Sequence, residues 1–376
     1  MGGVRVNALL FHQAIGCFGP YSEFRSLDEN CRSKKNLRRT LLVNTLCETI
    51  CRITGAESVE LGEVIQSLWS GYGVIQRADL YGVERQSVGD SVPVVIKHID
   101  ISHARANPRG WASDISHQRK VRSYQVEKTF YELFSEQCTQ ECQVPEFIAA
   151  DEIEDEGGWV IVLTDLNFLG FDSRKNHVDQ QDIHACLSWL ANFHATSMGN
   201  AATGLWPVGT YWHLETRPDE LAAMPDGALK NSAGLIDRRL NEATYQSLVH
   251  GDAKVANFCF SKRDPSCVAA VDFQYVGRGC GMKDVAYFIS SCLSEQAAVR
   301  QQDSLLSFYF EKLMFALASR NSEINFPALE CEWRELYPYA WADFCRFLAG
   351  WSPGHWKLNS YSDQITRSVL ERFEQN

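Results

Sequence analysis

The sequence predicts an α+β fold in two lobes, a small β-rich lobe followed by a larger, mostly helical one. A chain of 376 residues is long enough to build two packed cores. Short apolar runs of strand type recur between residues 59 and 166, whereas most later segments carry the apolar spacing of helices. We therefore expect an N-terminal extension with one helix (1–57), a small lobe (58–166) and a large lobe (167–376).

The composition is that of an ordinary globular protein, with 45% hydrophobic and 22% charged residues. A net charge of −11 argues against a nucleic-acid partner and is compatible with a cationic substrate. No apolar run reaches the roughly eighteen residues that a membrane-spanning helix needs, so no membrane association is expected. The thirteen cysteines form no Cys-x-x-Cys pair. We interpret them as small apolar residues of a reducing compartment, which favours the cytoplasm.

The small lobe is expected to begin with one helix and a series of short strands. Leu37 to Ile53 places apolar side chains at helical spacing, and Gly55 would end that helix. The runs Val59 to Leu61 and Val64 to Leu68 predict two short strands. Residues 1–35 carry no pattern that indicates a structure or a role.

The next segments combine a glycine turn with an unusual lysine. Residues 68–78 predict a strand, a turn containing Gly71 and Gly73, and a second strand. Such glycines let backbone N–H groups approach a phosphate, although an ordinary β-hairpin explains them equally well. Val92 to Ile99 predicts a strand with Lys97 in its interior. A buried lysine needs a partner, so Lys97 either meets phosphates and a carboxylate or points to solvent from an edge strand.

A strongly amphipathic helix is expected from Arg122 to Phe134. Its apolar face consists of Val126, Phe130, Leu133 and Phe134. Glu127 borders this face and is our choice as the partner of Lys97, with Glu132 as the second choice. The alternative for either carboxylate is a solvated position on the helix, because charged residues commonly face water.

The remaining elements alternate between two strands and a series of helices. Strands are expected from Val144 to Ala150 and from Trp159 to Leu166, the second ending in a polar pair, Thr164 and Asp165. Helical patterns follow at 179–198, 229–247, 305–318 and from Asp284 onward. His194 shares an apolar face of the first of these helices, and we interpret it as a hydrogen-bonded core histidine.

The stretch Leu248 to Asn257 carries the strongest functional signal. Asp252 and Asn257 are five residues apart, which suits one tight loop, and Asp272 follows after a spacing that suits a short hairpin. Phosphoryl transfer requires metal ions on the phosphates, a carboxylate that orients the attacking hydroxyl, and positive charge on the transferred group. Asp252 supplies the carboxylate and Lys254 the charge. Asn257 and Asp272 offer hard oxygen ligands for Mg²⁺.

The pattern His-Gly-Asp-x-x-x-x-Asn followed by Asp-Phe resembles the aminoglycoside phosphotransferase and choline kinase superfamily, and within it the ecdysteroid-kinase-like small-molecule kinases. This resemblance implies a two-lobed protein-kinase-like fold with ATP bound between the lobes. It implies that Asp252 is the catalytic base, that Asn257 and Asp272 hold Mg²⁺, and that Lys254 meets the γ-phosphate. Many antibiotic kinases carry histidine at the position of Lys254.

The resemblance also gives roles to residues of the small lobe. It implies that the glycine turn with Gly71 and Gly73 covers the phosphates and that Lys97 clamps the α- and β-phosphates. Glu127 matches the family pattern Glu-x-x-Phe-Tyr, which implies that it positions Lys97. The segment Leu163-Thr164-Asp165 resembles the hinge that reads adenine, with Thr164 where the family usually has glutamate. In the family, Asp284 anchors the catalytic loop.

The acceptor is expected to be a hydroxyl group of a small molecule. Gly277 to Gly281 forms a glycine-rich turn in place of a long activation segment, which suits a small acceptor. The aromatic residues of 206–219 and 333–356 either line its pocket, including as a cation–π box for an ammonium, or pack the lobe. Arg278 either reaches phosphate or pairs locally. The oligomeric state is not indicated.

Two alternatives to this function stay open. The first keeps the chemistry and changes the acceptor from a steroid-like molecule to choline, an aminoglycoside or a sugar. The second is a pseudokinase that binds nucleotide or partner proteins without turnover. Loss of Asp252, Asp272 or Lys97 would mark such a protein, and all three are present.

Overall fold

The computed structural model describes residues 43–68, 71–83, 91–101, 114–153 and 158–374. The chain divides into two compact units, Met1–Thr45 and Leu46–Asn376. In the first unit only residues 43–45 are described, and they are helical. All strands and helices discussed below belong to the second unit. The lobe boundaries expected near residues 57 and 166 stay a prediction.

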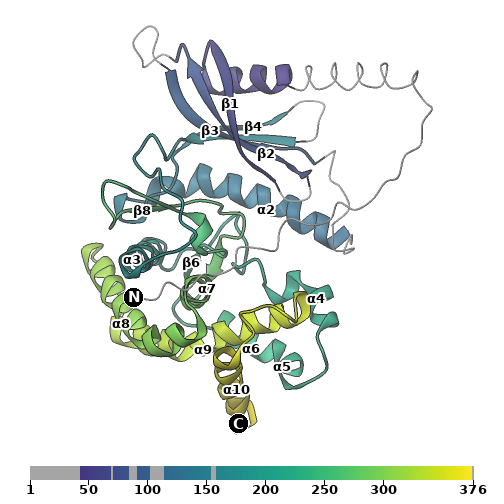
Figure 1. Ribbon diagram of the computed structural model, residues 1–376, viewed down its shortest axis with the longest axis vertical. Helices are drawn as coiled ribbons and strands as arrows, with labels where there is room; N and C mark the ends of the chain where they lie inside the picture. Colours follow the sequence, from purple (N-terminus) through teal and green to yellow (C-terminus); the bar gives the residue numbers. More distant parts are fainter. Residues whose placement is uncertain (1–42, 69–70, 84–90, 102–113, 154–157, 375–376) are drawn as a thin grey trace, which may run out of the picture. The chain divides into compact units, whose positions relative to one another are not determined.

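Five antiparallel strands form one sheet in the order β1-β2-β3-β5-β4 (Figure 1). The strands are β1 (Ser58–Ser67), β2 (Gly73–Tyr81), β3 (Ser91–Ile99), β4 (Phe147–Ile153) and β5 (Gly158–Thr164). The prediction of two short strands before residue 68 is wrong, because β1 is continuous. Irregularities in its pairing with β2, between Leu61 and Val64 and between Val64 and Gln66, shift the register without ending the strand.

The position of β3 decides the environment of Lys97. β3 lies between β2 and β5, so the edge-strand alternative for Lys97 is wrong. The backbone of Lys97 is opposite Ile75 on one side and Ile161 on the other, and the residue is 4% exposed. Alternation along the strand places Lys97 on the same face as Ile99 and opposite Ile96. The lysine therefore points into the protein interior.

Both faces of the sheet are covered by apolar residues. On the face of Ile96, Leu46 and Ile50 of an N-terminal helix belong to one buried cluster with the strands. This helix continues to residue 54, and Gly55 follows in the left-handed region at φ 72°, as expected for a helix end. The first predicted residues of the helix, 37–42, lie outside the described residues. On the other face, Ile99 shares a cluster with helix α2 (Asp114–Leu133), which runs beside the sheet in Figure 1.

Helix α2 begins at Asp114, well before the expected start at Arg122. Three of the predicted apolar-face residues are buried: Val126, Phe130 and Phe134. The fourth, Leu133, is 60% exposed, so that part of the prediction is wrong. Tyr131, which follows Glu127 by four residues, is buried instead of Leu133. The inward face is thus rotated toward Glu127, since residues four apart share one side of a helix.

The rest of the chain is mainly helical. The longer helices are α3 (Gln180–Thr196), α7 (Met282–Cys292), α8 (Glu295–Ser319), α9 (Phe326–Trp351) and α10 (Ser360–Glu374), and the shorter ones are α4 (Pro218–Ala223), α5 (Ala228–Asn231) and α6 (Ala233–Asn241). Asp179 caps α3 by accepting a hydrogen bond from the backbone N–H of Asp182, whose side chain returns the interaction. None of the described helices is long and apolar enough to cross a membrane.

Two small ribbons carry the functional segments. β6 (Ser247–Val249) pairs with β9 (Gly277–Gly279), and β7 (Phe258–Phe260) pairs with β8 (Val268–Ala270). The β7–β8 hairpin returns the chain toward Asn257, as predicted from the spacing to Asp272. The expected glycine-rich turn at 277–281 is wrong in its first half, because residues 277–279 form β9 against β6. This pairing depends on a strand about thirty residues earlier, which no local pattern reveals.

Candidate active site

The loop after β6 is anchored by the buried carboxylate of Asp284. Its two oxygens accept hydrogen bonds from the backbone N–H groups of His250 (2.6 Å) and Gly251 (2.9 Å). His194 contacts the same carboxylate, with its Nε2 3.1 Å from Asp284 Oδ2 and its Nδ1 2.7 Å from the Tyr309 hydroxyl. His194 and Asp284 are fully buried. The anchoring role implied for Asp284 and the core role expected for His194 both agree with these contacts.

Gly251 is required by the close approach of two segments. Its φ of 79° lies in the left-handed region, and a Cβ atom there would lie 2.1 Å from the carbonyl oxygen of Tyr275. The turn therefore needs glycine for both conformation and space. Its tight geometry brings the loop against the segment that follows Asp272.

The two oxygens of the Asp252 carboxylate differ in their hydrogen bonds. Oδ2 accepts hydrogen bonds from Lys254 Nζ at 2.7 Å and from Asn257 Nδ2 at 3.1 Å. Oδ1 is buried and has no hydrogen-bond partner of ordinary geometry among the described residues. A buried carboxylate oxygen without a donor is costly, so Oδ1 is ready to accept a hydrogen bond from a bound molecule. Burial acts to lower the pKa of Lys254, but the Asp252 carboxylate raises it, so the amine stays protonated.

Asp272 follows β8 in a strained backbone conformation, with φ 72°. Its Oδ1 accepts a hydrogen bond from Gln274 Nε2 at 2.6 Å and lies 3.6 Å from Lys97 Nζ. Although burial acts to raise the pKa of Asp272, Lys97 and Lys254 hold it below the ordinary value. The group is therefore an ionised carboxylate between two lysines. The strained φ directs this side chain toward them, which the sequence alone did not indicate.

Lys97 pairs with Glu127 and not with Glu132. Lys97 Nζ lies 2.5 Å from Glu127 Oε2, and both side chains are buried. Glu132 instead pairs with Lys128 on the exposed side of α2. The ring of Phe273 stacks on Phe130 of α2 with centroids 3.9 Å apart, which ties the helix that carries Glu127 to the segment that carries Asp272. Burial opposes the charge of Lys97, but Glu127 and then Asp272 raise its pKa.

The residues expected to hold a metal offer a suitable donor set. The amide nitrogen of Asn257 donates to the backbone oxygen of Asp252 at 2.8 Å, which leaves the amide oxygen without a hydrogen bond among the described residues. Asp272 contributes an ionised carboxylate. No group of three or more His, Cys, Asp or Glu side chains that could hold a metal occurs in the described part of the chain. One amide oxygen, one carboxylate and phosphate oxygens together suit Mg²⁺, which usually keeps few protein ligands.

The glycine turn between β1 and β2 is partly described, since residues 69 and 70 lie outside the described residues. Gly71 and Gly73 have φ of 79° and 124°, and a Cβ atom on Gly73 would lie 2.0 Å from the carbonyl oxygen of His98. Leu68 N–H donates to Gly73 O at 2.8 Å and closes the turn. The turn therefore brings the β1–β2 connection against the end of β3, the strand of Lys97.

The segment after β5 is held by its own contacts. Thr164 Oγ1 accepts a hydrogen bond from the backbone N–H of Glu146 at 2.9 Å, and Leu163 is buried. Asp165 accepts from Arg77 Nε at 2.9 Å and from Asn167 N–H at 2.8 Å. The side chains of Thr164 and Asp165 thus serve the local structure. The backbone is also engaged, because the Thr164 N–H donates to the carbonyl oxygen of Glu146 at 3.1 Å and the Asp165 carbonyl oxygen accepts from the Phe168 N–H at 3.0 Å.

A cavity of about 300 Å³ opens beside Asp252 and Lys254. Its other lining residues are Tyr211, Tyr275, Tyr287, Phe344, Leu348, Trp351, His355 and Lys357. They come from five separate stretches of sequence, including the aromatic region that was expected either to line the pocket or to pack the lobe. Both expectations hold for different residues, because Phe344 and Trp351 line the cavity whereas Trp333 and Tyr337 are buried in the core.

Sequence reasoning missed several residues of the site. Lys120 of α2 donates to Gln274 Oε1 at 2.6 Å and lies 4.6 Å from the centre of the Tyr124 ring, so it adds a cation next to Asp272. Tyr287 and Lys357 border the cavity beside Asp252. The signal that could have revealed Lys120 is its place about two turns before Glu127, on the same side of one helix. Lys357 gave no such signal. Arg278 is exposed on β9, and its role stays open.

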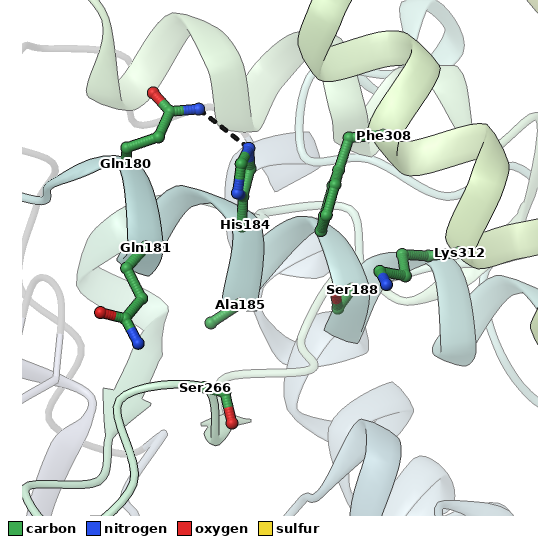
Figure 2. Close-up of a pocket in the computed structure, with 8 residues that line it drawn as sticks. All are labelled: Gln180, Gln181, His184, Ala185, Ser188, Ser266, Phe308 and Lys312. Carbon is green, nitrogen blue, oxygen red and sulfur yellow. Dashed lines mark hydrogen bonds between the residues drawn. The ribbon is translucent and has the colours of Figure 1, made fainter.

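A second cavity, of about 470 Å³, lies between α3, α8 and the loop that carries Ser266 (Figure 2). Within it, the His184 ring stacks on Phe308 with centroids 4.1 Å apart, and Gln180 Nε2 lies 2.9 Å from His184 Nε2. Lys312 Nζ lies 5.1 Å from the centre of the Phe308 ring. This cavity shares no lining residue with the one beside Asp252, and we assign it no part in phosphoryl transfer.

Asp284→Ala is expected to lower the free energy of unfolding by about 3 kcal/mol, because two buried N–H groups lose their acceptor at about 1–3 kcal/mol each. Urea denaturation of the variant measures this change. Asp264→Ala is the matched control, since Asp264 forms its hydrogen bonds at the surface and its loss should cost less than about 0.5 kcal/mol. Equal losses in the two variants would show that Asp284 does not anchor the loop.

Comparison with known proteins places the chain in a family. The model of the ecdysteroid kinase-like family matches residues 76–203 and 211–321. No curated protein matches the chain.

Three solved structures of low sequence identity also match. A candidate aminoglycoside phosphotransferase of Ralstonia eutropha JMP134 is 14% identical, with a TM-score of 0.49 over 88% of this chain and 95% of that one. The macrolide 2′-phosphotransferase MphH of Brachybacterium faecium is 14% identical, with a TM-score of 0.43 over 87% and 96%. The amicoumacin kinase hAmiN, solved with AMP-PNP and Ca²⁺, is 10% identical, with a TM-score of 0.43 over 93% and 96%.

The family match carries the assignment. Its two segments span more than half of the chain and include Lys97, Asp252 and Asp272. They stop before α9, so several residues of the cavity beside Asp252 lie beyond them. The chain belongs to the ecdysteroid kinase-like family of small-molecule phosphotransferases.

Proposed function

We propose that the protein transfers the γ-phosphate of ATP to a hydroxyl group of a small molecule bound in the cavity beside Asp252. The observation that carries this proposal is the Asp252 carboxylate. One of its oxygens is held by Lys254 and Asn257, and the other is buried and has no hydrogen-bond partner of ordinary geometry in the part of the chain that the structure describes. An incoming hydroxyl would donate its hydrogen bond to that open oxygen, which orients the nucleophile and receives its proton.

The lysines supply the positive charge that phosphoryl transfer needs. Lys97, held by Glu127, would bind the α- and β-phosphates. Lys254 is protonated and half-exposed beside Asp252, where it can meet the transferred group. Fixed charges of this kind stabilise the developing charge without reorganising during the reaction. Lys120 is a third cation near the same phosphates.

Asn257 and Asp272 would hold Mg²⁺. The ion, when bound, neutralises charge on the phosphate oxygens and so makes the γ-phosphorus easier to attack. Asp272 suits this task because it is ionised and its position is set by Gln274 and Lys97. We further propose that the turn with Gly71 and Gly73 covers the phosphates and that backbone groups of the 163–165 segment bind adenine.

The acceptor that the cavity favours has an apolar body. Five of its lining residues are aromatic, and the family description points to a steroid-like molecule with a hydroxyl group. A choline-, aminoglycoside- or sugar-type acceptor is the alternative. Aromatic walls suit flat apolar rings, whereas polyhydroxylated sugars require many polar partners. These features support an apolar hydroxylated acceptor.

Metal dependence of nucleotide binding provides the test. Wild-type protein with Mg²⁺ and ATP at a hundred times the dissociation constant should gain about 2.7 kcal/mol of stability. A gain of this size raises the melting temperature by several degrees. In Asp272→Asn, the rise that depends on Mg²⁺ should disappear while any rise with ATP alone remains.

Asp264→Asn serves as the control, because it removes a carboxylate at the surface and should leave both parts of the shift unchanged. A wild-type protein that does not respond to Mg²⁺ and ATP would overturn the proposal. The search would then turn to partner proteins, as the pseudokinase alternative requires.

A further inference from the structure

The cavity beside Asp252 is lined by a buried lysine, Lys357, to which the proposed phosphoryl transfer assigns no role. Lys357 lies between α9 and α10 and lines the cavity, yet it is only 9% exposed. It lies beyond the segments matched by the family model.

The ammonium group of Lys357 lacks a full set of partners. Its Nζ donates one hydrogen bond, to Ser290 Oγ at 3.1 Å, and no described carboxylate forms an ion pair with it. A lysine ammonium has three N–H donors, so two are left without an acceptor among the described residues. Buried cations are normally paired, because desolvation without compensation is costly. Lys357 thus lines the cavity with two of its three N–H donors unused among the described residues.

The charge balance of the cavity leaves Lys357 uncompensated. Among the described lining residues, Asp252 is the one carboxylate, and Lys254 already pairs with it. Burial lowers the pKa of Lys357 to about 7, while Cys292 and then Asp252 oppose this change. Near neutral pH a substantial fraction of the molecules therefore carries a charge here. An anion or a polar oxygen in the cavity would stabilise that charge.

Two of the five aromatic rings that line the cavity already contact the ammonium group of this lysine. Lys357 Nζ lies 4.8 Å from the centre of the Tyr287 ring and 5.2 Å from that of Phe344. Both rings line the cavity. A cation–π position at these two rings is therefore occupied by the protein's own cation. A second ammonium at this position would meet like charge.

We infer that Lys357 determines acceptor specificity: it donates a hydrogen bond to a carboxylate or carbonyl oxygen of an otherwise apolar hydroxylated acceptor, and it disfavours acceptors that carry an ammonium group. This inference deepens the proposed function and rests on it, because it takes the cavity beside Asp252 as the acceptor site. It selects between the two acceptor classes that the sequence left open, against choline and aminoglycosides.

Three matched probes test the inference by binding alone. Each has a naphthalene ring with a hydroxymethyl group at position 6, and position 2 carries a carboxylate, a methyl ketone or an aminomethyl group. Calorimetric titration into the full-length wild-type protein should show the carboxylate or the ketone binding at least about tenfold more tightly than the ammonium. In Lys357→Met, this preference should vanish.

A second variant distinguishes the two oxygen sources. Lys357→Gln keeps a neutral N–H donor but no charge, so an acceptor recognised through a carbonyl should keep most of its affinity. An acceptor recognised through a carboxylate should lose about as much as in Lys357→Met. Lys262→Met is the control, because Lys262 pairs with Asp172 at the surface with its side chain 66% exposed.

The outcomes separate this inference from the kinase proposal. Binding of the probes requires no phosphoryl transfer, and the Mg²⁺-dependent ATP shift of each variant reports an intact fold and nucleotide site. Wild-type protein that binds the ammonium probe as tightly as the others, or binds none of them, overturns the role of Lys357. So does a preference that persists in Lys357→Met. If Mg²⁺ and ATP do not raise the melting temperature but the probes show the expected preference, only the kinase proposal is overturned.

Discussion

Asp252→Asn is expected to reduce turnover at least about a thousandfold while the affinity for Mg²⁺–ATP stays within about twofold. The amide has nearly the shape of the carboxylate, so the loop can keep its fold. It lacks the negative charge that orients and deprotonates the acceptor hydroxyl, and it no longer balances Lys254. Initial rates with the best acceptor measure turnover, and calorimetric titration measures nucleotide affinity.

The matched control for this substitution is Asp226→Asn. Asp226 pairs with Lys230 at the surface, and such exposed pairs contribute little. Its rates should equal those of the wild type. Turnover of Asp252→Asn near the wild-type level would remove Asp252 from the catalytic role and would require another group to receive the proton.

Lys97→Met is expected to lower kcat/KM for ATP more than about a hundredfold and the free energy of unfolding by about 3–5 kcal/mol. The two effects have different causes. The catalytic loss follows from the missing charge on the phosphates. The loss of stability follows because Glu127 stays in the core without its partner 2.5 Å away. Steady-state kinetics and urea denaturation measure the two quantities on the same preparation.

A double variant separates these causes. Lys97→Met with Glu127→Leu removes both charges and fills the space with apolar atoms, so most of the stability should return. Activity should not return, because nothing then binds the phosphates. Lys128→Met is the control on the same helix; Lys128 pairs with Glu132 with its side chain 31% exposed, and its loss should cost at most about 1 kcal/mol. Recovered activity in the double variant would refute the role of Lys97.

The clustering of Asp252, Lys254, Asn257 and Asp272 was predictable because their geometry is set by short stretches of chain. Asp252, Lys254 and Asn257 lie within one turn, so their spacing alone brings the side chains together. The β7–β8 hairpin returns Asp272 to the same place, and two short apolar strands are enough to predict it. Lys97 was recognisable because a charge inside an apolar strand demands a partner.

Other features depended on partners far away in the sequence. Whether Lys97 lies on a central or an edge strand depends on β5, more than fifty residues later, and the strand at Gly277–Gly279 exists only because β6 pairs with it. The inward face of α2 is set by what packs on it, so Leu133 is exposed although it shares the helical spacing of Phe130. Periodicity identifies a helix face to within about one position and no better.

The sequence by itself determined the chemistry of this protein, since a carboxylate, an amide and a lysine within six residues, with a carboxylate one hairpin later, specify phosphoryl transfer through local geometry. Only the tertiary structure assembled the cavity in which we propose that the acceptor binds. The cavity wall joins Tyr211, Tyr287, Phe344 and Lys357 from separate segments. Each is an ordinary residue in its own stretch. Only packing brings these residues together. The small number of partners around the buried Lys357 ammonium is therefore apparent only from the tertiary structure.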